Sequence, residues 1–307
     1  MLQQWSQRQA DQAAGFRQKY FNFADIPNEI ATRILIFASA DWPTYRSLIL
    51  VSRRIRTLVY DTCLYHLPIM LHTQNDFCSF YTLISSHSAV GPCIRSLWLV
   101  AGTDTSVECT TGYAMLRKCP SIIHLACNVN LLRVLVYSSA PFIHHKLKDL
   151  TLIEPTTVPW AELLCQPAAG LLFGQLTHLR VSGGTELVVP KFEFTSLSHL
   201  SFECSRPRGP FVMFAGAGAS ESESAPLVFE CTNFPVLQQI ALSTAYLFRS
   251  RSMDPSQAAG RQVVTDNRMD VFVLPNIWKE AEVWEDTRRG GPDIWTRARV
   301  GDSKRLH

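Results

Sequence analysis

The chain has 307 residues, 47% of them hydrophobic, and a formal net charge of +3 at pH 7. A chain of this length and composition can bury a sizeable core, which excludes a wholly disordered protein. The small net charge, without a strongly basic stripe, gives no electrostatic footprint for nucleic acid, so we expect no nucleic-acid partner.

The nine cysteines are scattered and form no C-x-x-C pair. Scattered cysteines of this kind favour reduced, mostly buried thiols over disulfides or zinc ligands. The sequence has no Asn-x-Ser/Thr acceptor and no signal-like apolar run at its start, and serines, Gly91 and Pro92 interrupt its longest uncharged stretch. We therefore expect no membrane partner and a cytoplasmic or nuclear location.

Residues 1–20 are rich in glutamine and predict a solvated tail, and residues 21–66 predict a short helical module. A first helix is expected to begin near Asp25, with Pro27 in its first turn. Its apolar residues Ile30, Ile34 and Phe37 recur at helical spacing and make a wide stripe.

A second helical pattern follows the break at Asp41-Trp42-Pro43 and places Leu48, Val51 and Ile55 on one side. Ser52 is placed to cap a further turn. About forty residues are too few to stabilise such helices alone, so their uncovered apolar surface predicts a docking site.

The stretches I-P-N-E-I, I-L-I-F and L-I-L-V-S-R-R-I-R resemble, in this order and spacing, the F-box family. The positions that match the family pattern are Ile26, Pro27, Glu29, Ile30, Ile34, Val51, Ser52 and Arg53. Ile55 departs from it, because the family usually has an aromatic residue there. The alternative to an F-box is an ordinary helical hairpin that caps the rest of the fold.

Residues 67–307 carry a short template, apolar-x-x-apolar-x-apolar. Its copies are Ile94 to Leu99, Ile122 to Cys127, Leu147 to Leu152, Leu176 to Val181, Leu197 to Phe202 and Leu237 to Leu242, followed by a looser copy at Val271-Phe272-Val273. The alternation predicts strands, and the intervals contain helical runs such as 114–119 and 131–137. Most intervals suit leucine-rich repeats.

The predicted fold is therefore α/β, with short N-terminal F-box helices followed by an irregular leucine-rich-repeat-like solenoid of parallel strands and helices. A Gly-, Ser- and Pro-rich surface insertion is expected at about 205–234. A Trp-bearing helix after the last strand is expected to close the open end of the solenoid.

When the copies are superimposed, two columns of residues share one strand face, which we expect to be open to solvent. The columns are Ser96, His124, Asp149, His178, His199 and Gln239, and Trp98, Ala126, Thr151, Arg180, Ser201 and Ala241. The plainer interpretation is polar filler at tolerant positions. The alternative is a partner-binding patch formed by Trp98, His124, His178, Arg180 and His199; we expect no metal there.

The F-box resemblance implies that the helices bind the adaptor subunit of an SCF-type cullin-RING ubiquitin ligase, while the repeat domain binds a substrate protein that the sequence does not identify. Such a receptor acts by proximity, so we expect no catalytic residue and no cofactor. Two alternatives remain open: a repeat scaffold that recruits no ligase, and an enzyme of unrecognised type.

Overall fold

The computed structural model describes residues 26–39, 42–100, 106–141, 143–153, 160–182, 192–204, 233–244, 270–275 and 280–296. The expected tail at 1–20 and nearly all of the expected insertion at 205–234 lie outside these ranges. Asp25, the expected start of the first helix, lies outside them too.

Three short helices begin the described chain: α2 (Asn28–Ala38), α3 (Trp42–Val51) and α4 (Arg53–Thr62). The sequence predicted Pro27 in the first turn of α2. In the structure Pro27 is instead the N-cap residue, with ψ 144°, and is the last extended residue before the helix. Ser52 caps α4 as predicted, since its hydroxyl accepts a hydrogen bond from the Ile55 amide.

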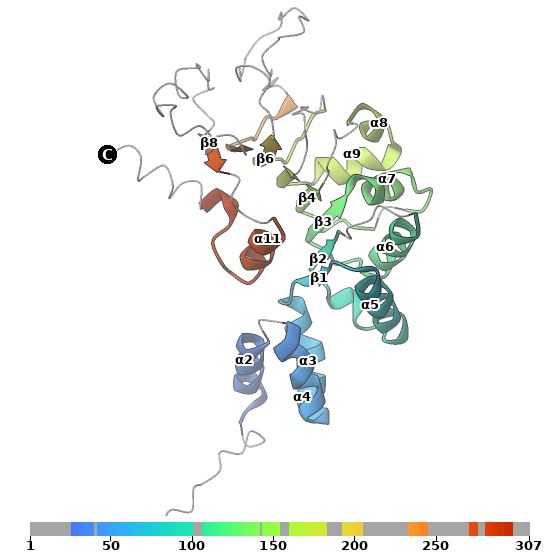
Figure 1. Cartoon of the computed structure of the whole chain (residues 1–307), viewed down its shortest axis with the longest axis vertical. Helices are drawn as coiled ribbons and strands as arrows, with labels where there is room; N and C mark the ends of the chain where they lie inside the picture. Colours follow the sequence, from blue (N-terminus) through green and yellow to red (C-terminus); the bar gives the residue numbers. More distant parts are fainter. Residues whose placement is uncertain are drawn as a thin grey trace, which may run out of the picture.

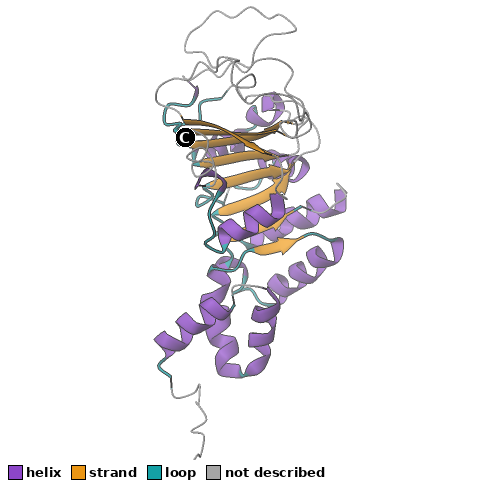
Figure 2. Cartoon of the chain, turned by 60° about the vertical axis from the view of Figure 1, so that its left-hand side comes forward, coloured by secondary structure: helices purple, strands orange, loops and turns teal. Residues whose placement is uncertain are grey.

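An all-parallel sheet follows, and in the described residues it contains eight strands in strict sequence order. The strands are β1 (Ile69–Leu71), β2 (Ser96–Leu99), β3 (His124–Asn128), β4 (Asp149–Ile153), β5 (His178–Ser182), β6 (His199–Cys204), β7 (Gln239–Thr244) and β8 (Asp270–Pro275). Figure 2 shows them succeeding one another along the length of the molecule.

The register of the sheet is the one that the sequence template predicts. Leu97, Leu125, Leu150, Leu179 and Leu200 align as direct partners from β2 to β6. The alignment continues to Ile240 on β7, although the long segment 205–232 separates β6 from β7. The seven strands predicted from the template are therefore confirmed, whereas β1 was not predicted.

Helices lie between the successive strands from β1 to β5. They are α5 (Gln74–Ser86), α6 (Ser106–Lys118), α7 (Val129–Tyr137), α8 (Trp160–Leu164) and α9 (Pro167–Gly174), with 3-10 turns η2 (Cys63–Tyr65) and η3 (Gly91–Cys93). Side chains start two of them, because Thr73 and Asp76 form a capping box for α5 and Asn128 caps α7. Helices α5 to α9 all lie on one side of the sheet (Figure 1).

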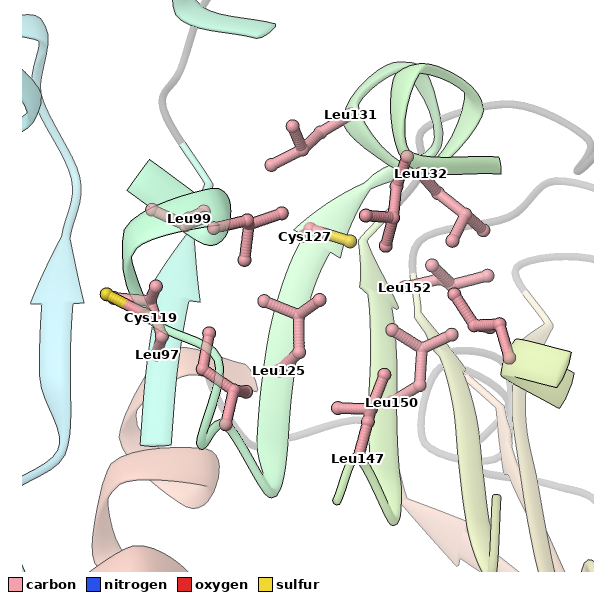
Figure 3. Close-up of a cluster of buried hydrophobic side chains, with 14 of the residues drawn as sticks. Leu97, Leu99, Cys119, Leu125, Cys127, Leu131, Leu132, Leu147, Leu150 and Leu152 are labelled. Atoms are coloured by element: carbon pink, nitrogen blue, oxygen red, sulfur yellow. The ribbon is translucent and has the colours of Figure 1, made fainter. Parts of the chain in front are cut away.

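The main core fills the space between the sheet and these helices. Figure 3 shows side chains of β2, β3 and β4 converging with those of α7. Leu97, Leu125 and Leu150 are fully buried, and Cys127 points into the same core (Figure 3). The cluster also includes Leu35 of α2, so the N-terminal helices share a continuous core with the sheet.

Helix α11 (Glu280–Arg288) lies on the opposite side of the sheet from α5 to α9 (Figure 1). Two expectations are corrected here. The Trp-bearing helix was expected to close the end of the strand array, but it packs across the strand face. That face was expected to be solvated, yet Trp98 is only 3% exposed and Thr151 is also buried.

Candidate functional site

Exposed apolar side chains gather on the N-terminal helices. Of the nine large apolar residues exposed in the described chain, five lie on α2 and α3: Ile30, Ile34, Phe37, Leu50 and Val51. Phe37 is 83% exposed and Leu50 76% exposed. Scattered exposed apolar residues are ordinary, but five on two successive short helices mark a region where the described residues leave apolar side chains uncovered.

Most residues that match the F-box pattern lie on this exposed surface. Pro27, Glu29, Ile30, Ile34, Val51, Ser52 and Arg53 are exposed, and Ile26 is half-buried. Arg54, which the sequence did not single out, joins the helices: its guanidinium donates to the Ile26 carbonyl at 3.0 Å and to Asn28 Oδ1 at 2.7 Å. The start of α2 is thereby fixed against α4.

The second candidate surface is the strand face, which we define as the side of β2 to β7 that carries the two predicted columns. His178 and His199, in direct register on β5 and β6, stack with ring centroids 4.3 Å apart and planes 12° from parallel. Trp295 meets the His199 ring edge-on, with centroids 5.0 Å apart. The structure thus brings two of the three predicted histidines together.

The residue before each histidine fixes its ring. The Thr177 hydroxyl donates to the Lys148 carbonyl, so its oxygen accepts a hydrogen bond from His178 Nδ1–H, 2.9 Å away. Ser198 does the same for His199, at 2.8 Å. Burial lowers the pKa of His178, and the nearby Asp149 carboxylate does not offset this effect. His178 is therefore neutral at pH 7.

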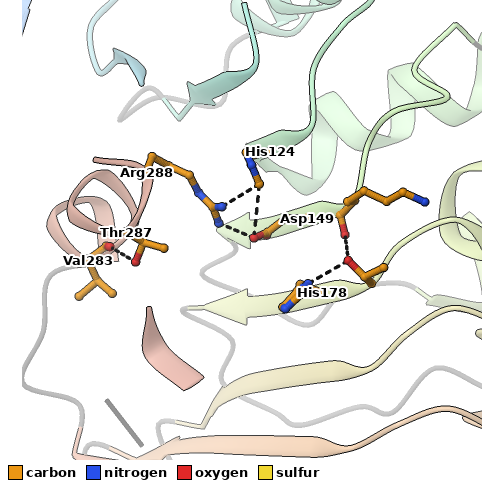
Figure 4. A network of polar contacts seen from close by, with 8 residues as sticks. His124, Asp149, His178, Val283, Thr287 and Arg288 are labelled. Atoms are coloured by element: carbon orange, nitrogen blue, oxygen red, sulfur yellow. Dashed lines mark hydrogen bonds and ion pairs between the residues drawn. The ribbon is translucent and has the colours of Figure 1, made fainter. Parts of the chain in front are cut away.

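Asp149 anchors a charged contact at the middle of the strand face (Figure 4). Arg288 of α11 forms an ion pair with Asp149, and both side chains are 14% exposed. Arg288 also donates to His124 Nδ1 at 2.7 Å, which requires that nitrogen to carry no proton. Burial would raise the pKa of Asp149, but the Arg288 charge outweighs burial and holds that pKa well below its usual range.

Arg180 forms a second ion pair with α11, through Glu280 at the other end of the helix. The two side chains are 12% and 15% exposed, so water screens the pair little. Glu280 lies in the first turn of α11 and Arg288 in the last, where their charges suit the helix dipole. Both termini of α11 are therefore tied to the sheet.

Between the two ion pairs, Trp284 of α11 packs on Trp98 and Ala126 in a small apolar cluster. Neither indole N–H has a hydrogen-bond partner among the described residues, although both side chains are almost fully buried. A buried donor without a partner costs about 1–3 kcal/mol. This interface is therefore less well satisfied than the main core.

A pocket of about 230 Å³ remains between the strand face and the C-terminal segment. Its walls include His124, His178 and Arg180 of the predicted patch. Sequence reasoning missed the other side of the pocket, formed by Trp284, Arg288 and Trp295 among others, and it did not assign Asp149 a role. The only sequence signal was that Asp149 is the one acid in a column of neutral and basic residues.

Among the described residues, no three His, Cys, Asp or Glu side chains are grouped to hold a metal ion. In the same part of the chain, no helix combines the length and apolar character that crossing a bilayer requires. The arrangement of the strand face is suited to binding: paired charges, aromatic rings and imidazole side chains line the pocket.

Comparison with known proteins leaves the family open. No protein-family model matches the chain, and no curated protein is significantly similar to it.

Proposed function

We propose that the chain is the substrate receptor of an SCF-type ubiquitin ligase, with α2 to α4 docking on the adaptor subunit and the strand face binding a target protein. The observation that carries the proposal is the exposed apolar surface of Ile30, Ile34 and Val51, which coincides with the F-box-like positions. Docking would bury this surface, and the burial would supply most of the binding free energy.

The array of strands would be an irregular leucine-rich-repeat-like solenoid that presents the target. Parallel strands in sequence order, each paired only with its neighbours, support this interpretation. The receptor itself would be non-catalytic, because holding a target lysine near a charged ubiquitin carrier raises its effective concentration. Such a role would place the chain in the cytoplasm or the nucleus.

A repeat scaffold that recruits no ligase is the second candidate, and one observation favours it. Leu35, Tyr45 and Val59 of the N-terminal helices belong to the same buried cluster as the sheet. The helices would then serve as a cap at the start of the array, as terminal units do in repeat proteins.

Titration of the full chain with the purified adaptor subunit separates the two candidates. If the chain is a receptor, the adaptor binds it. The double variant Ile30→Asp/Ile34→Asp should then bind the adaptor at least tenfold more weakly, because the two new charges would have to be desolvated at the interface. Leu171→Asp is the matched control: Leu171 is 60% exposed on α9, outside the docking helices, so binding should persist. Absence of adaptor binding by the unmodified chain would leave the scaffold as the function.

A further inference from the structure

Helix α11 presents a single stripe to the strand face. Glu280, Trp284 and Arg288 are spaced four residues apart, which places them on one side of the helix. Glu285 and Arg289, by contrast, pair with each other and are about one-third exposed. The stripe, with Ala281 beside it, is therefore the side of α11 that packs against the sheet.

Each residue of the stripe meets a complementary group. Glu280 pairs with Arg180 on β5, and Trp284 packs on Trp98 of β2. Arg288 pairs with Asp149 on β4. These three groups come from different strands, and parallel pairing holds them at fixed separations. The strand face is thus a preformed three-point receptor for a helix that carries an acid, an aromatic ring and an arginine.

The match with α11 is incomplete. The apolar cluster beneath α11 consists of Trp98, Ala126 and Trp284 with a few half-buried neighbours, whereas the opposite side of the sheet has a long continuous core. The Trp98 and Trp284 indole N–H groups and Arg288 Nε are buried without a hydrogen-bond partner among the described residues. Of these donors only the Trp98 indole belongs to the strand face, so a ligand that brings an acceptor to it would bind this face better than α11 does.

We propose that α11 is an internal occupant of the target-binding face, and that the target is an amphipathic helix carrying an acidic residue, an aromatic residue and an arginine at successive four-residue intervals. The target competes with α11 for Arg180, Trp98 and Asp149. This inference rests on the proposed receptor function, because it names the class of target that the strand face accepts.

The probe is a fluorescent peptide with the sequence of residues 280–296, added to the full chain and followed by anisotropy. The unmodified chain binds it weakly, because its own α11 occupies the face at a high effective concentration. A chain with Trp284→Ala and Arg288→Ala releases α11 and binds the peptide at least tenfold more tightly. A peptide in which the Glu280 and Arg288 positions are exchanged binds neither chain, because like charges then meet Arg180 and Asp149.

Equal binding of the peptide to both chains, or equal binding of the charge-exchanged peptide, would overturn the inference. Hydrogen exchange on the unmodified protein provides a test that needs no substitution. The α11 amides should exchange through a local opening well before those of β3 and β4. If they exchange only when the strands unfold, α11 is a permanent part of the fold and the inference is wrong.

Adaptor titration of the same unmodified chain keeps the two proposals distinguishable. If the unmodified chain binds the adaptor but the Trp284→Ala/Arg288→Ala chain does not bind the peptide, the proposed target class is wrong and the proposed receptor function stands. If the peptide binds but the adaptor does not, the proposed ligase receptor function is wrong and the chain is a scaffold that binds helices.

Discussion

The indole of Trp284 on α11 meets the indole of Trp98 on β2 edge-on, with ring centroids 5.6 Å apart and planes 66° from parallel. The two residues lie at opposite ends of the described sheet-bearing chain, yet they form the centre of the apolar contact between the last helix and the second strand. Edge-to-face pairs of this kind are favourable beyond the area that they bury.

A double-mutant cycle on this pair should give a coupling energy of about 1 kcal/mol. Trp98→Ala and Trp284→Ala each loosen α11, so their combined effect on its opening free energy should be smaller than the sum of the two. The opening free energy is measured by hydrogen exchange of the α11 amides. Strictly additive effects would show that the rings do not stabilise each other.

Arg288→Met should lower the free energy that holds α11 closed by about 3–5 kcal/mol, because Asp149 would be left charged and buried without its partner. Adding Asp149→Asn should restore part of the loss, since the unpaired charge is then gone. Arg289→Met is the control one residue beyond the end of α11: its pair with Glu285 is partly exposed, so the change should cost about 0.3–0.5 kcal/mol. Comparable losses from Arg288→Met and Arg289→Met in hydrogen exchange would contradict the anchoring role.

Ser52→Ala should reduce the free energy of unfolding by about 1 kcal/mol, because the Ser52 hydroxyl caps α4 at the Ile55 amide. Ser47→Ala is the matched control. The Ser47 hydroxyl only donates to the Pro43 carbonyl within α3, an interaction that does not support a helix, so its loss should be nearly neutral. Urea denaturation of both variants checks the difference, and equal effects would argue against the cap.

Gly91→Ala should destabilise the protein by about 1–3 kcal/mol, as overpacking does in a filled core. A Cβ at Gly91 would lie 2.1 Å from the Lys118 carbonyl oxygen, which is backbone and cannot move aside cheaply. At Gly170, in helix α9, a Cβ would meet nothing within 4 Å, so Gly170→Ala should stabilise the protein by about 0.5–1 kcal/mol. Thermal unfolding of the two variants should therefore shift in opposite directions.

Stability should fall as the pH is lowered from 6.5 to 4, in part because of His144. Burial, followed by the charges of Arg117 and His145, lowers the pKa of His144 to about 4. The unfolded chain takes up a proton near pH 6.5 that the folded chain accepts only near pH 4, so the stabilisation is full above this window and is lost across it. The loss amounts to about 3 kcal/mol.

His144→Leu should flatten this part of the pH profile of the unfolding free energy. The control is His145→Gln, at the exposed neighbouring position, and this variant should keep most of the slope. Urea titrations between pH 7 and pH 4 supply the comparison. A His144→Leu profile parallel to that of the unmodified chain would show that other groups carry the effect.

The strands and their register could be predicted from the sequence because apolar residues alternate in each strand and occupy the same positions of the repeated template. Leu97, Leu125 and Leu150 occupy the same position of the template and become direct partners. Strand β1 escaped the same reading because His66 occupies the leading position, which is isoleucine or leucine in the other copies up to β7. One polar residue at that position was enough to hide the strand.

The covering of the strand face could not be read in this way. Alternation shows that Trp98 and Arg180 share a side of the sheet, but it carries no information about what lies above them. That depends on where a distant helix docks, and Glu280 and Arg288 become visible as partners only when β5 and β4 are placed beside α11. The residues of the predicted patch therefore share one strand face as expected, while their exposure was misjudged and their binding of a partner stays a prediction.

The register between β6 and β7 matches that of the other strand pairs, and this bears on how the sequence can evolve. Leu200 still aligns with Ile240 although the connection at 205–232 is longer than the others. The register of a strand is set by its match to the edge of the preceding strand, and doubling the length of the connection costs only about 0.6 kcal/mol. Sequence can be gained or lost at this junction while the neighbouring strands keep their geometry, which makes it a natural place for new segments and for an inserted affinity tag.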